Sequence, residues 1–208
     1  MFKNLIFDID GTLLNTKEVG MRALQKALYD DFHIEQTLAE LEFAFSGTAL
    51  QVYEKYHIPL DRQDAFAQHV LENSESMAPS IDPFPGIEDL LQQLQQQAIN
   101  LAIVTSENHF ELEAIFGKKT IAHYFQHFVT ADDVRQPKPD PEPTVQALQI
   151  LGAQPSETLF IGDSRSDIAS AHQAQVAFGL AGWGANPQDN FDDADYQFAH
   201  PQEVLSIL

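Results

Sequence analysis

The chain has 208 residues, of which 44% are hydrophobic and 20% are charged, so we expect a globular protein with one full core and room for a smaller second unit. It carries 11 Lys and Arg residues against 31 Asp and Glu residues, and this formal charge of −20 argues against nucleic acid or an anionic membrane surface as a partner. The absence of cysteine excludes disulfides, thiolate metal sites and cysteine nucleophiles. With no signal-peptide pattern and no apolar run approaching the ~20 residues of a membrane span, a cytoplasmic location is expected.

The N-terminal part of the sequence predicts one strand followed only by helices. Residues 5–9 predict a short buried strand, which ends in Asp8 and Asp10 just before Gly11. Residues 17–77 lack strand patterns and carry apolar residues at helical spacing instead. The expected helices contain Val19, Ala23, Ala27 and Leu28 in the first, Leu38, Leu41 and Phe45 in the second, and residues 48–57 and 62–76 in the last two.

A change of pattern follows the segment 78–86, where three prolines and a glycine exclude a continuous helix. After a helix that contains Leu90, Leu91, Leu94 and Ala98 with solvated glutamines between them, strands alternate with helices. This alternation predicts an α/β fold with a doubly wound parallel sheet. The expected strands cover residues 101–104, 128–130, 158–161, 176–180 and 196–198.

Chemically useful side chains stand at the ends of these strands, where parallel sheets bind ligands. On an extended chain Asp8 and Asp10 would point to the same side, and Asp163 and Asp167 could join them. The repulsion among four carboxylates would raise some of their pKa values, and a divalent cation would relieve it. Oxygen ligands suit Mg²⁺, which keeps coordination positions open for water and phosphate and so points to phosphoryl chemistry.

Phosphoryl transfer also needs cations and hydrogen-bond donors around the phosphate oxygens. Lys138 stands between two prolines, ahead of a helix expected over residues 144–151. Thr105 offers a hydroxyl and a backbone N–H at a strand end, and Ser106 and Asn108 are candidates for contacts with the substrate. Taken singly, each of these residues has an ordinary structural explanation, as a turn, a helix cap or a surface lysine.

Four motifs in order make the chain similar to the haloacid dehalogenase-like hydrolase superfamily, in its Mg²⁺-dependent phosphatase branch, which includes phosphoglycolate phosphatases and β-phosphoglucomutases. The resemblance extends over essentially the whole chain. The motifs are Asp8-Ile9-Asp10-Gly11-Thr12-Leu13, then Thr105 after an apolar strand, then Lys138 in Lys-Pro-Asp-Pro, and finally Gly162-Asp163-Ser164-Arg165-Ser166-Asp167.

The resemblance implies a Rossmann-like catalytic core, residues 1–15 and 82–208, with an α-helical cap inserted at residues 16–81. It further implies that the enzyme hydrolyses a small phosphorylated metabolite, as a monomer or a homodimer. The chemistry would lie wholly in the core. The cap would close over the site and choose the leaving group, and Gly47 marks the cap loop expected to face the substrate.

The resemblance also implies a role for each motif residue. Asp8 would attack phosphorus to form an aspartyl-phosphate, and Asp10 would protonate the leaving group and then activate water. The Asp8 carboxylate, the Asp10 backbone carbonyl and Asp163 would hold Mg²⁺. Asp167 would act through water or by orienting Lys138. Thr105 and Lys138 would bind phosphate oxygens.

Two alternatives remain open. A sugar phosphomutase of the β-phosphoglucomutase type would carry a histidine four residues after Thr16, where this chain has Gly20, and a basic loop, whereas residues 45–50 contain no Lys or Arg. A catalytically idle binding or regulatory module would be expected to lack the nucleophile, which is present. The substrate itself stays open among phosphoglycolate, sugar phosphates, nucleoside monophosphates and pyrophosphate.

Overall fold

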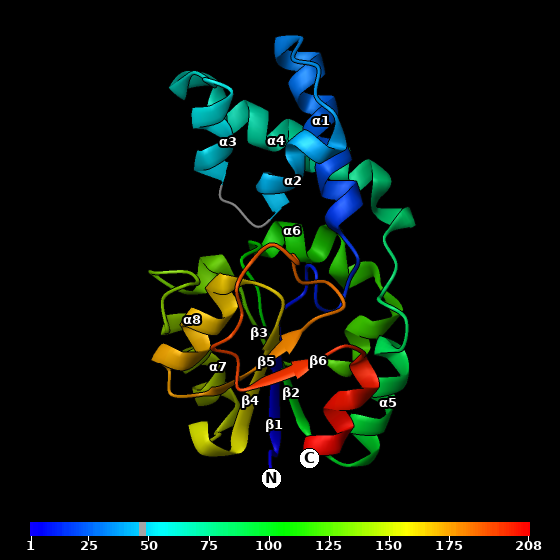
Figure 1. Cartoon of the computed structure of the whole chain (residues 1–208), viewed down its shortest axis with the longest axis vertical. Coiled ribbons are helices and arrows are strands. Elements are labelled where there is room, and N and C mark those ends of the chain that lie inside the picture. Colours follow the sequence, from blue (N-terminus) through cyan, green and yellow to red (C-terminus); the bar gives the residue numbers. More distant parts are fainter. Residues whose placement is uncertain (46–48) are drawn as a thin grey trace. The chain divides into compact units, whose positions relative to one another are not determined.

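A six-stranded sheet, in the order β3-β2-β1-β4-β5-β6 and parallel throughout, forms the centre of the computed structural model, which describes residues 1–45 and 49–208 (Figure 1). The predicted α/β class, with a parallel sheet and an inserted helical region, is confirmed. The strands are β1 (Asn4–Phe7), β2 (Asn100–Val104), β3 (Phe128–Val129), β4 (Thr158–Gly162), β5 (Ala177–Ala181) and β6 (Tyr196–Phe198).

The first strand is shorter than the predicted span of residues 5–9. Asp8 still donates its backbone N–H to the carbonyl of Ile161 on β4. Beyond it the chain turns, because the Ile9 carbonyl accepts from the backbone N–H groups of Thr12, Leu13 and Leu14. The turn therefore begins immediately after Asp8, a boundary that the apolar pattern alone does not reveal.

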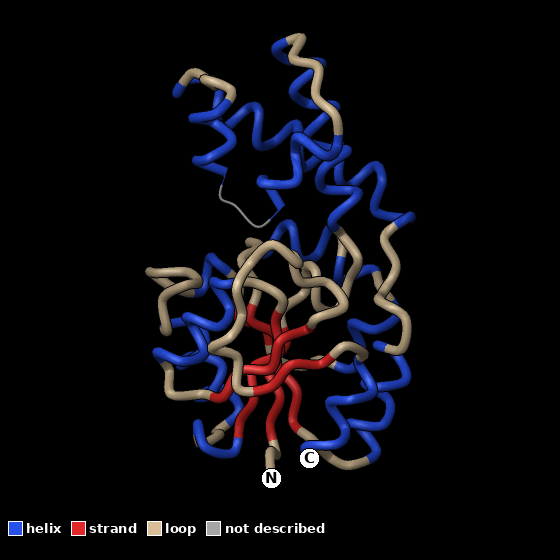
Figure 2. The backbone as a smooth tube through the Cα atoms, in the orientation of Figure 1, coloured by secondary structure: helices blue, strands red, loops and turns tan. Residues whose placement is uncertain are grey.

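Helices cover both faces of the sheet (Figure 2). One face packs against α7 (Glu142–Leu151) and α8 (Arg165–Gln173), with Ile6 and Phe160 fully buried between strands and helices. The opposite side carries α5 (Ile87–Gln96), whose Ile87, Leu90, Leu91 and Leu94 are buried while its glutamines are exposed. Burial on both faces explains why the strands read as continuous apolar runs.

The chain divides into two compact units, one of Met1–Asn15 with Pro83–Leu208, and one of Thr16–Asp82. The described part of the second unit contains helices joined by loops, with no strand, and has its own apolar core, which includes Leu28, Leu41 and Phe66. Its helices are α1 (Lys17–Phe32), α2 (Leu38–Phe45), α3 (Ala49–Lys55) and α4 (Gln63–Met77), and the first unit adds α6 (His109–Ala114). Short 3-10 helices occupy Leu60–Arg62, Ala78–Ser80, Phe116–Lys118, Thr120–Tyr124, Ala131–Asp133, Pro155–Glu157 and Pro201–Ile207.

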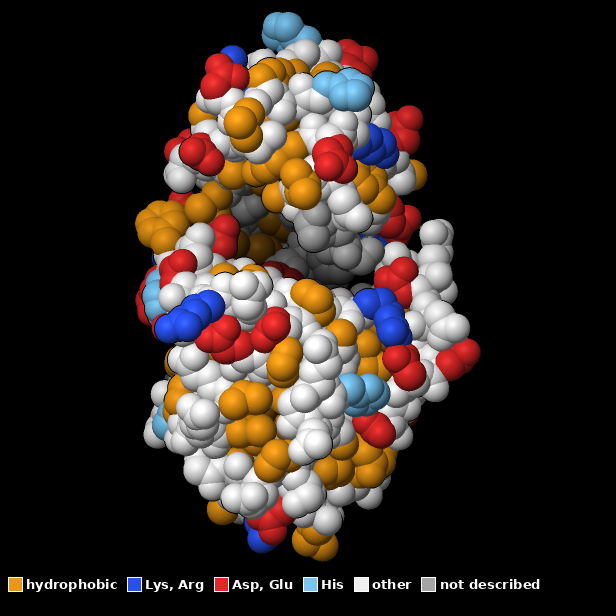
Figure 3. Space-filling model, turned by 90° about the vertical axis from the view of Figure 1, so that its left-hand side faces the viewer, with side chains coloured by type: hydrophobic (Ala, Val, Ile, Leu, Met, Phe, Trp, Pro, Cys, Tyr) orange, Lys and Arg blue, Asp and Glu red, His pale blue; other side chains and the backbone are white. Residues whose placement is uncertain are grey.

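On the face drawn in Figure 3, Asp and Glu side chains are dispersed among apolar and basic ones on both units. In the part of the chain that the structure describes, no helix has both the length and the apolar character needed to cross a bilayer.

Replacing Phe160 by alanine tests the core beneath the strand ends. Phe160 is fully buried and contacts the ring of Phe178, so Phe160→Ala should lower the free energy of unfolding by about 3–5 kcal/mol. Urea unfolding followed by circular dichroism measures the loss. The matched variant Phe110→Ala removes a ring that is 60% exposed and should change stability by less than about 0.5 kcal/mol. Similar losses in the two variants would contradict this placement of the core.

Candidate active site

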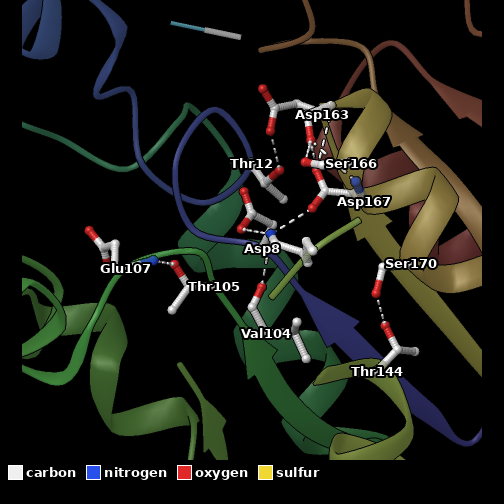
Figure 4. A network of polar contacts seen from close by, with 12 residues as sticks. Asp8, Thr12, Val104, Thr105, Glu107, Thr144, Asp163, Ser166, Asp167 and Ser170 are labelled. Carbon is white, nitrogen blue, oxygen red and sulfur yellow. Dashed lines mark hydrogen bonds and ion pairs between the residues drawn. The ribbon is translucent and has the colours of Figure 1, made fainter. Parts of the chain in front are cut away.

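Three of the predicted site residues follow three neighbouring strands. Asp8 follows β1, Thr105 follows β2 and Asp163 follows β4. Because β1 pairs in parallel with both β2 and β4, the carboxyl ends of these strands meet at one edge of the sheet. All three residues are buried, and Figure 4 shows Asp8 between Thr105 and Asp163 in this view.

The ammonium group of Lys138 connects the strand ends to α8. Its Nζ donates to Asp8 Oδ1 at 2.6 Å, to Asp167 Oδ1 at 2.6 Å and to the Val104 carbonyl at 3.3 Å. The side chain is only 3% exposed. A lysine has three N–H donors, and these three acceptors use all of them, which fixes both the lysine and the two carboxylates.

Asp167 serves two neighbours at once. Its Oδ1 accepts from Lys138, and its Oδ2 accepts from the backbone N–H of Ser164 at 3.0 Å and from the Ser164 hydroxyl at 2.6 Å. The second set of contacts is a capping box at the start of α8. The capping box therefore orients the Asp167 side chain so that its Oδ1 accepts from Lys138.

Asp163 lies close to the turn that follows β1. Its Oδ1 accepts from the hydroxyl of Thr12 at 3.1 Å. Gly11 adopts a φ of +77°, and a Cβ on this glycine would lie 2.1 Å from Asp163 Oδ2. Only glycine suits this position, since it allows both the left-handed backbone and the close approach of the carboxylate.

Burial and mutual repulsion govern the pKa values of these acids. The pKa of Asp8 is raised to about 7, mainly by burial; Lys138 opposes this shift, and the charges of Asp167 and Asp10 add to it. The pKa of Asp163 is raised well above its usual range by burial and by the charges of Asp8 and Asp167. Burial acts to lower the pKa of Lys138, but Asp167 and Asp8 outweigh it, and the net shift is upward.

The three buried carboxylates fit a divalent cation. Asp8, Asp163 and Asp167 each offer an oxygen, and these oxygens lie within 4.8 Å of one another. Three carboxylates against the single ammonium of Lys138 leave an excess of two negative charges when all are ionised. Hard oxygen ligands and this excess charge are what Mg²⁺ requires, so the group could hold such an ion.

One sequence-based expectation about the strand ends was wrong, and another stays a prediction. The three carboxylates whose oxygens lie within 4.8 Å of one another are those of Asp8, Asp163 and Asp167. The charge of Asp10 also acts on Asp8, and its role in the site stays a prediction. The backbone N–H of Thr105 is not available to a phosphate, because it donates to the Val129 carbonyl at 3.0 Å and extends the ladder with β3. The Thr105 hydroxyl accepts from the Glu107 N–H at 3.1 Å and still has its own proton to donate.

The remaining candidates lie outside this network. Asn108 is the N-cap of α6, and its side-chain oxygen accepts from the backbone N–H of Glu111 at 2.9 Å. This contact accounts for the asparagine without a substrate. Ser106 is exposed beside Thr105. Gly47 lies outside the described residues.

Three residues of the site region carry no motif that the sequence reveals. Trp183 donates its indole N–H to the Thr12 carbonyl at 2.9 Å, and a Cβ on Gly184 would lie 1.8 Å from the Gly11 carbonyl oxygen. The loop after β5 thus packs closely against the turn after β1. The third residue is Glu107, whose Oε2 is buried without a hydrogen-bond partner.

The comparisons with known proteins agree with this geometry. A family model described as haloacid dehalogenase-like hydrolase matches residues 5–181. The chain belongs to this family. The resemblance drawn from the four motifs is confirmed, and the chain is a hydrolase by family.

Relatives of this hydrolase include phosphatases of nearly equal length. The pyrophosphatase PpaX of Oceanobacillus iheyensis is 29% identical, with 99% of this chain and 96% of the relative covered. A phosphoglycolate phosphatase of Aquifex aeolicus is 26% identical, with 98% and 95% covered. The crystal structure of a candidate phosphoglycolate phosphatase from Lactobacillus plantarum superposes with a TM-score of 0.91 at 31% identity and covers both chains fully.

The raised pKa of Asp8 predicts how stability depends on pH without metal. In the folded chain Asp8 keeps its proton up to about pH 7, whereas an unfolded aspartate loses it near about pH 4. The folded state therefore binds more protons in this interval, and the stability contributed by protonated Asp8 is lost as the pH rises through it. Asp8→Asn removes this titration, so its free energy of unfolding should fall less than that of the wild type.

Urea unfolding in EDTA at about pH 5 and about pH 8, for both proteins, measures this difference. An equal fall in the two proteins would show that Asp8 does not titrate as its surroundings indicate. At the higher pH, Mg²⁺ should stabilise the wild type more than Asp8→Asn, because the ion replaces the lost proton as the compensating charge.

Proposed function

We propose that this hydrolase is a Mg²⁺-dependent phosphatase that acts on a small phosphorylated metabolite through an aspartyl-phosphate on Asp8. One observation carries the proposal. A buried aspartate at the end of the central strand is held by a buried lysine at 2.6 Å, next to two further buried carboxylates. The phosphatases among its relatives support the same reaction class.

In the proposed mechanism a carboxylate oxygen of Asp8 attacks phosphorus, and the bond between phosphorus and the leaving oxygen breaks. Asp10 gives its proton to that oxygen and then takes a proton from the water that hydrolyses the aspartyl-phosphate. The Thr105 hydroxyl donates to a phosphoryl oxygen. The Val104 carbonyl is the longest of the three Lys138 contacts, so it is the contact that a phosphoryl oxygen would replace.

The residues proposed to hold Mg²⁺ are Asp8 and Asp163 through carboxylate oxygens and Asp10 through its backbone carbonyl. Asp167 would contribute through water or by orienting Lys138, and its direct bond to the lysine supports the second role. When bound, the ion supplies positive charge next to the phosphoryl oxygens. The closeness of the three carboxylate oxygens supports this proposal.

We further propose that the unit Thr16–Asp82 acts as the cap and the other unit as the catalytic core. The helical unit has its own apolar core and contributes no member of the carboxylate triad. Because the relatives include a pyrophosphatase and a phosphoglycolate phosphatase, pyrophosphate and phosphoglycolate are the first substrates to test. A panel of phosphorylated metabolites, which also includes sugar phosphates and nucleoside monophosphates, ranked by kcat/KM, would identify the substrate class.

Asp8→Asn tests the nucleophile. The amide keeps the shape of the side chain but cannot attack phosphorus, so kcat for p-nitrophenyl phosphate should fall by several orders of magnitude. Asp61→Asn is the control, because Asp61 is an exposed aspartate of the helical unit and should leave kcat unchanged. A variant that keeps more than about a tenth of wild-type kcat would remove Asp8 from the mechanism.

Chelation tests the metal. Turnover of p-nitrophenyl phosphate should disappear in EDTA and return on addition of excess Mg²⁺. Ca²⁺ should bind but support little turnover, because its larger and looser coordination sphere misplaces nucleophile and phosphorus. Full activity in excess chelator would contradict a metal-dependent mechanism.

A further inference from the structure

Glu107 has a buried carboxyl oxygen with nothing in the described structure to bind it. Its Oε2 has no hydrogen-bond partner. The residue is fixed by its backbone, whose N–H donates to the Thr105 hydroxyl oxygen at 3.1 Å. Figure 4 shows Glu107 next to Thr105, on the other side of Asp8 from Asp163 and Asp167 in that view. An unsatisfied buried acceptor costs free energy, so such an oxygen at a site indicates a missing donor.

The surroundings of Glu107 are acidic. Burial is the main cause that raises the pKa of Glu107 well above its usual range, and the charges of Asp10, Asp8 and Glu111 raise it further. Burial also raises the pKa of Glu111, and the charge of Asp10 raises it further. An additional anion bound at this point would face several carboxyl groups at short range.

Lys138 is the basic side chain whose charge opposes these acids at Glu107. The three donors of Lys138 are already shared among Asp8, Asp167 and Val104. Lys3 and Arg165 pair with the acidic side chains of Glu157 and Asp193, and Arg135 and Lys118 are exposed. The local charges thus oppose a second anion on the substrate and suit a hydrogen-bond donor.

We propose that Glu107 determines the substrate class of the active site, by accepting a hydrogen bond from a hydroxyl of the leaving group and disfavouring leaving groups that carry a second anion. The inference rests on the proposed phosphatase function. It predicts a preference for monophosphates of sugars and polyols over phosphoglycolate and pyrophosphate. In this respect the chain would differ from the relatives that are named for those two substrates.

Two substrates with the same carbon skeleton test the proposal. 2-Hydroxyethyl phosphate and 2-phosphoglycolate differ in that one ends in a hydroxymethyl group and the other in a carboxylate. With Mg²⁺, wild-type kcat/KM should favour 2-hydroxyethyl phosphate by about tenfold or more, as expected for one repulsive carboxylate contact replaced by a hydrogen bond. p-Nitrophenyl phosphate, assayed in parallel, reports the basic phosphatase reaction.

Glu107→Gln keeps the size of the side chain, replaces its carboxyl group by a neutral amide and adds an N–H donor. It should lower the preference for 2-hydroxyethyl phosphate by about tenfold, mainly by raising kcat/KM for 2-phosphoglycolate. Glu113→Gln makes the same chemical change at an exposed position of α6 and should leave the preference unchanged. Glu107→Asp keeps a carboxyl group and should retain the wild-type direction of the preference.

The outcomes separate the two proposals. A wild type that hydrolyses 2-phosphoglycolate at least as efficiently as 2-hydroxyethyl phosphate would overturn the role of Glu107 and leave the phosphatase proposal intact, whatever the variants do. The same holds if the preference is equal in Glu107→Gln and Glu113→Gln. Absence of Mg²⁺-dependent turnover of p-nitrophenyl phosphate by the wild type would overturn the proposed function, and this inference with it.

Discussion

The structure of the site depends on one buried interaction, the pair of 2.6 Å bonds from Lys138 Nζ to Asp8 and Asp167. A buried charge is tolerated only when it is paired, and loss of one partner of a buried ion pair typically costs about 3–5 kcal/mol. Here one ammonium joins the end of β1, the end of β2 through Val104 and the first turn of α8. The lysine that holds the proposed nucleophile therefore also connects two strand ends and a helix of the fold.

Close backbone approach is the second constraint on the site. A carboxylate at the end of β4 can reach the turn after β1 only if Gly11 has no side chain, and the loop after β5 can cover that turn only if Gly184 has none. The indole of Trp183 then satisfies the Thr12 carbonyl at 2.9 Å. Parallel pairing of β1, β4 and β5 brings the loops after these strands together. The positions of the glycines and of the acidic residues therefore depend on the same strand order.

The sequence predicts what depends on local pattern and on parallel pairing. Apolar runs mark the strands, and parallel strands put Asp8, Thr105 and Asp163 at one edge, so the fold and the convergence of these residues could be expected. What depends on a local turn or a neighbouring strand could not. The turn after Asp8 ends the strand earlier than the apolar run does, and pairing with β3 uses the Thr105 N–H. Glu107 and Trp183 belong to no periodic pattern, and only their contacts reveal them.

The motif residues explain why family membership leaves the substrate open. In the proposed mechanism Asp8, Thr105, Lys138 and Asp163 all act on the transferred phosphoryl group, and that group is common to every phosphatase substrate. Discrimination must come from side chains that touch the leaving group, and such side chains need no fixed spacing in the sequence. Glu107 meets the physical requirement for one of them, because its buried oxygen lacks a donor and its neighbours already concentrate negative charge. The charge balance near the nucleophile, more than the fold, would then decide which phosphate esters the enzyme accepts.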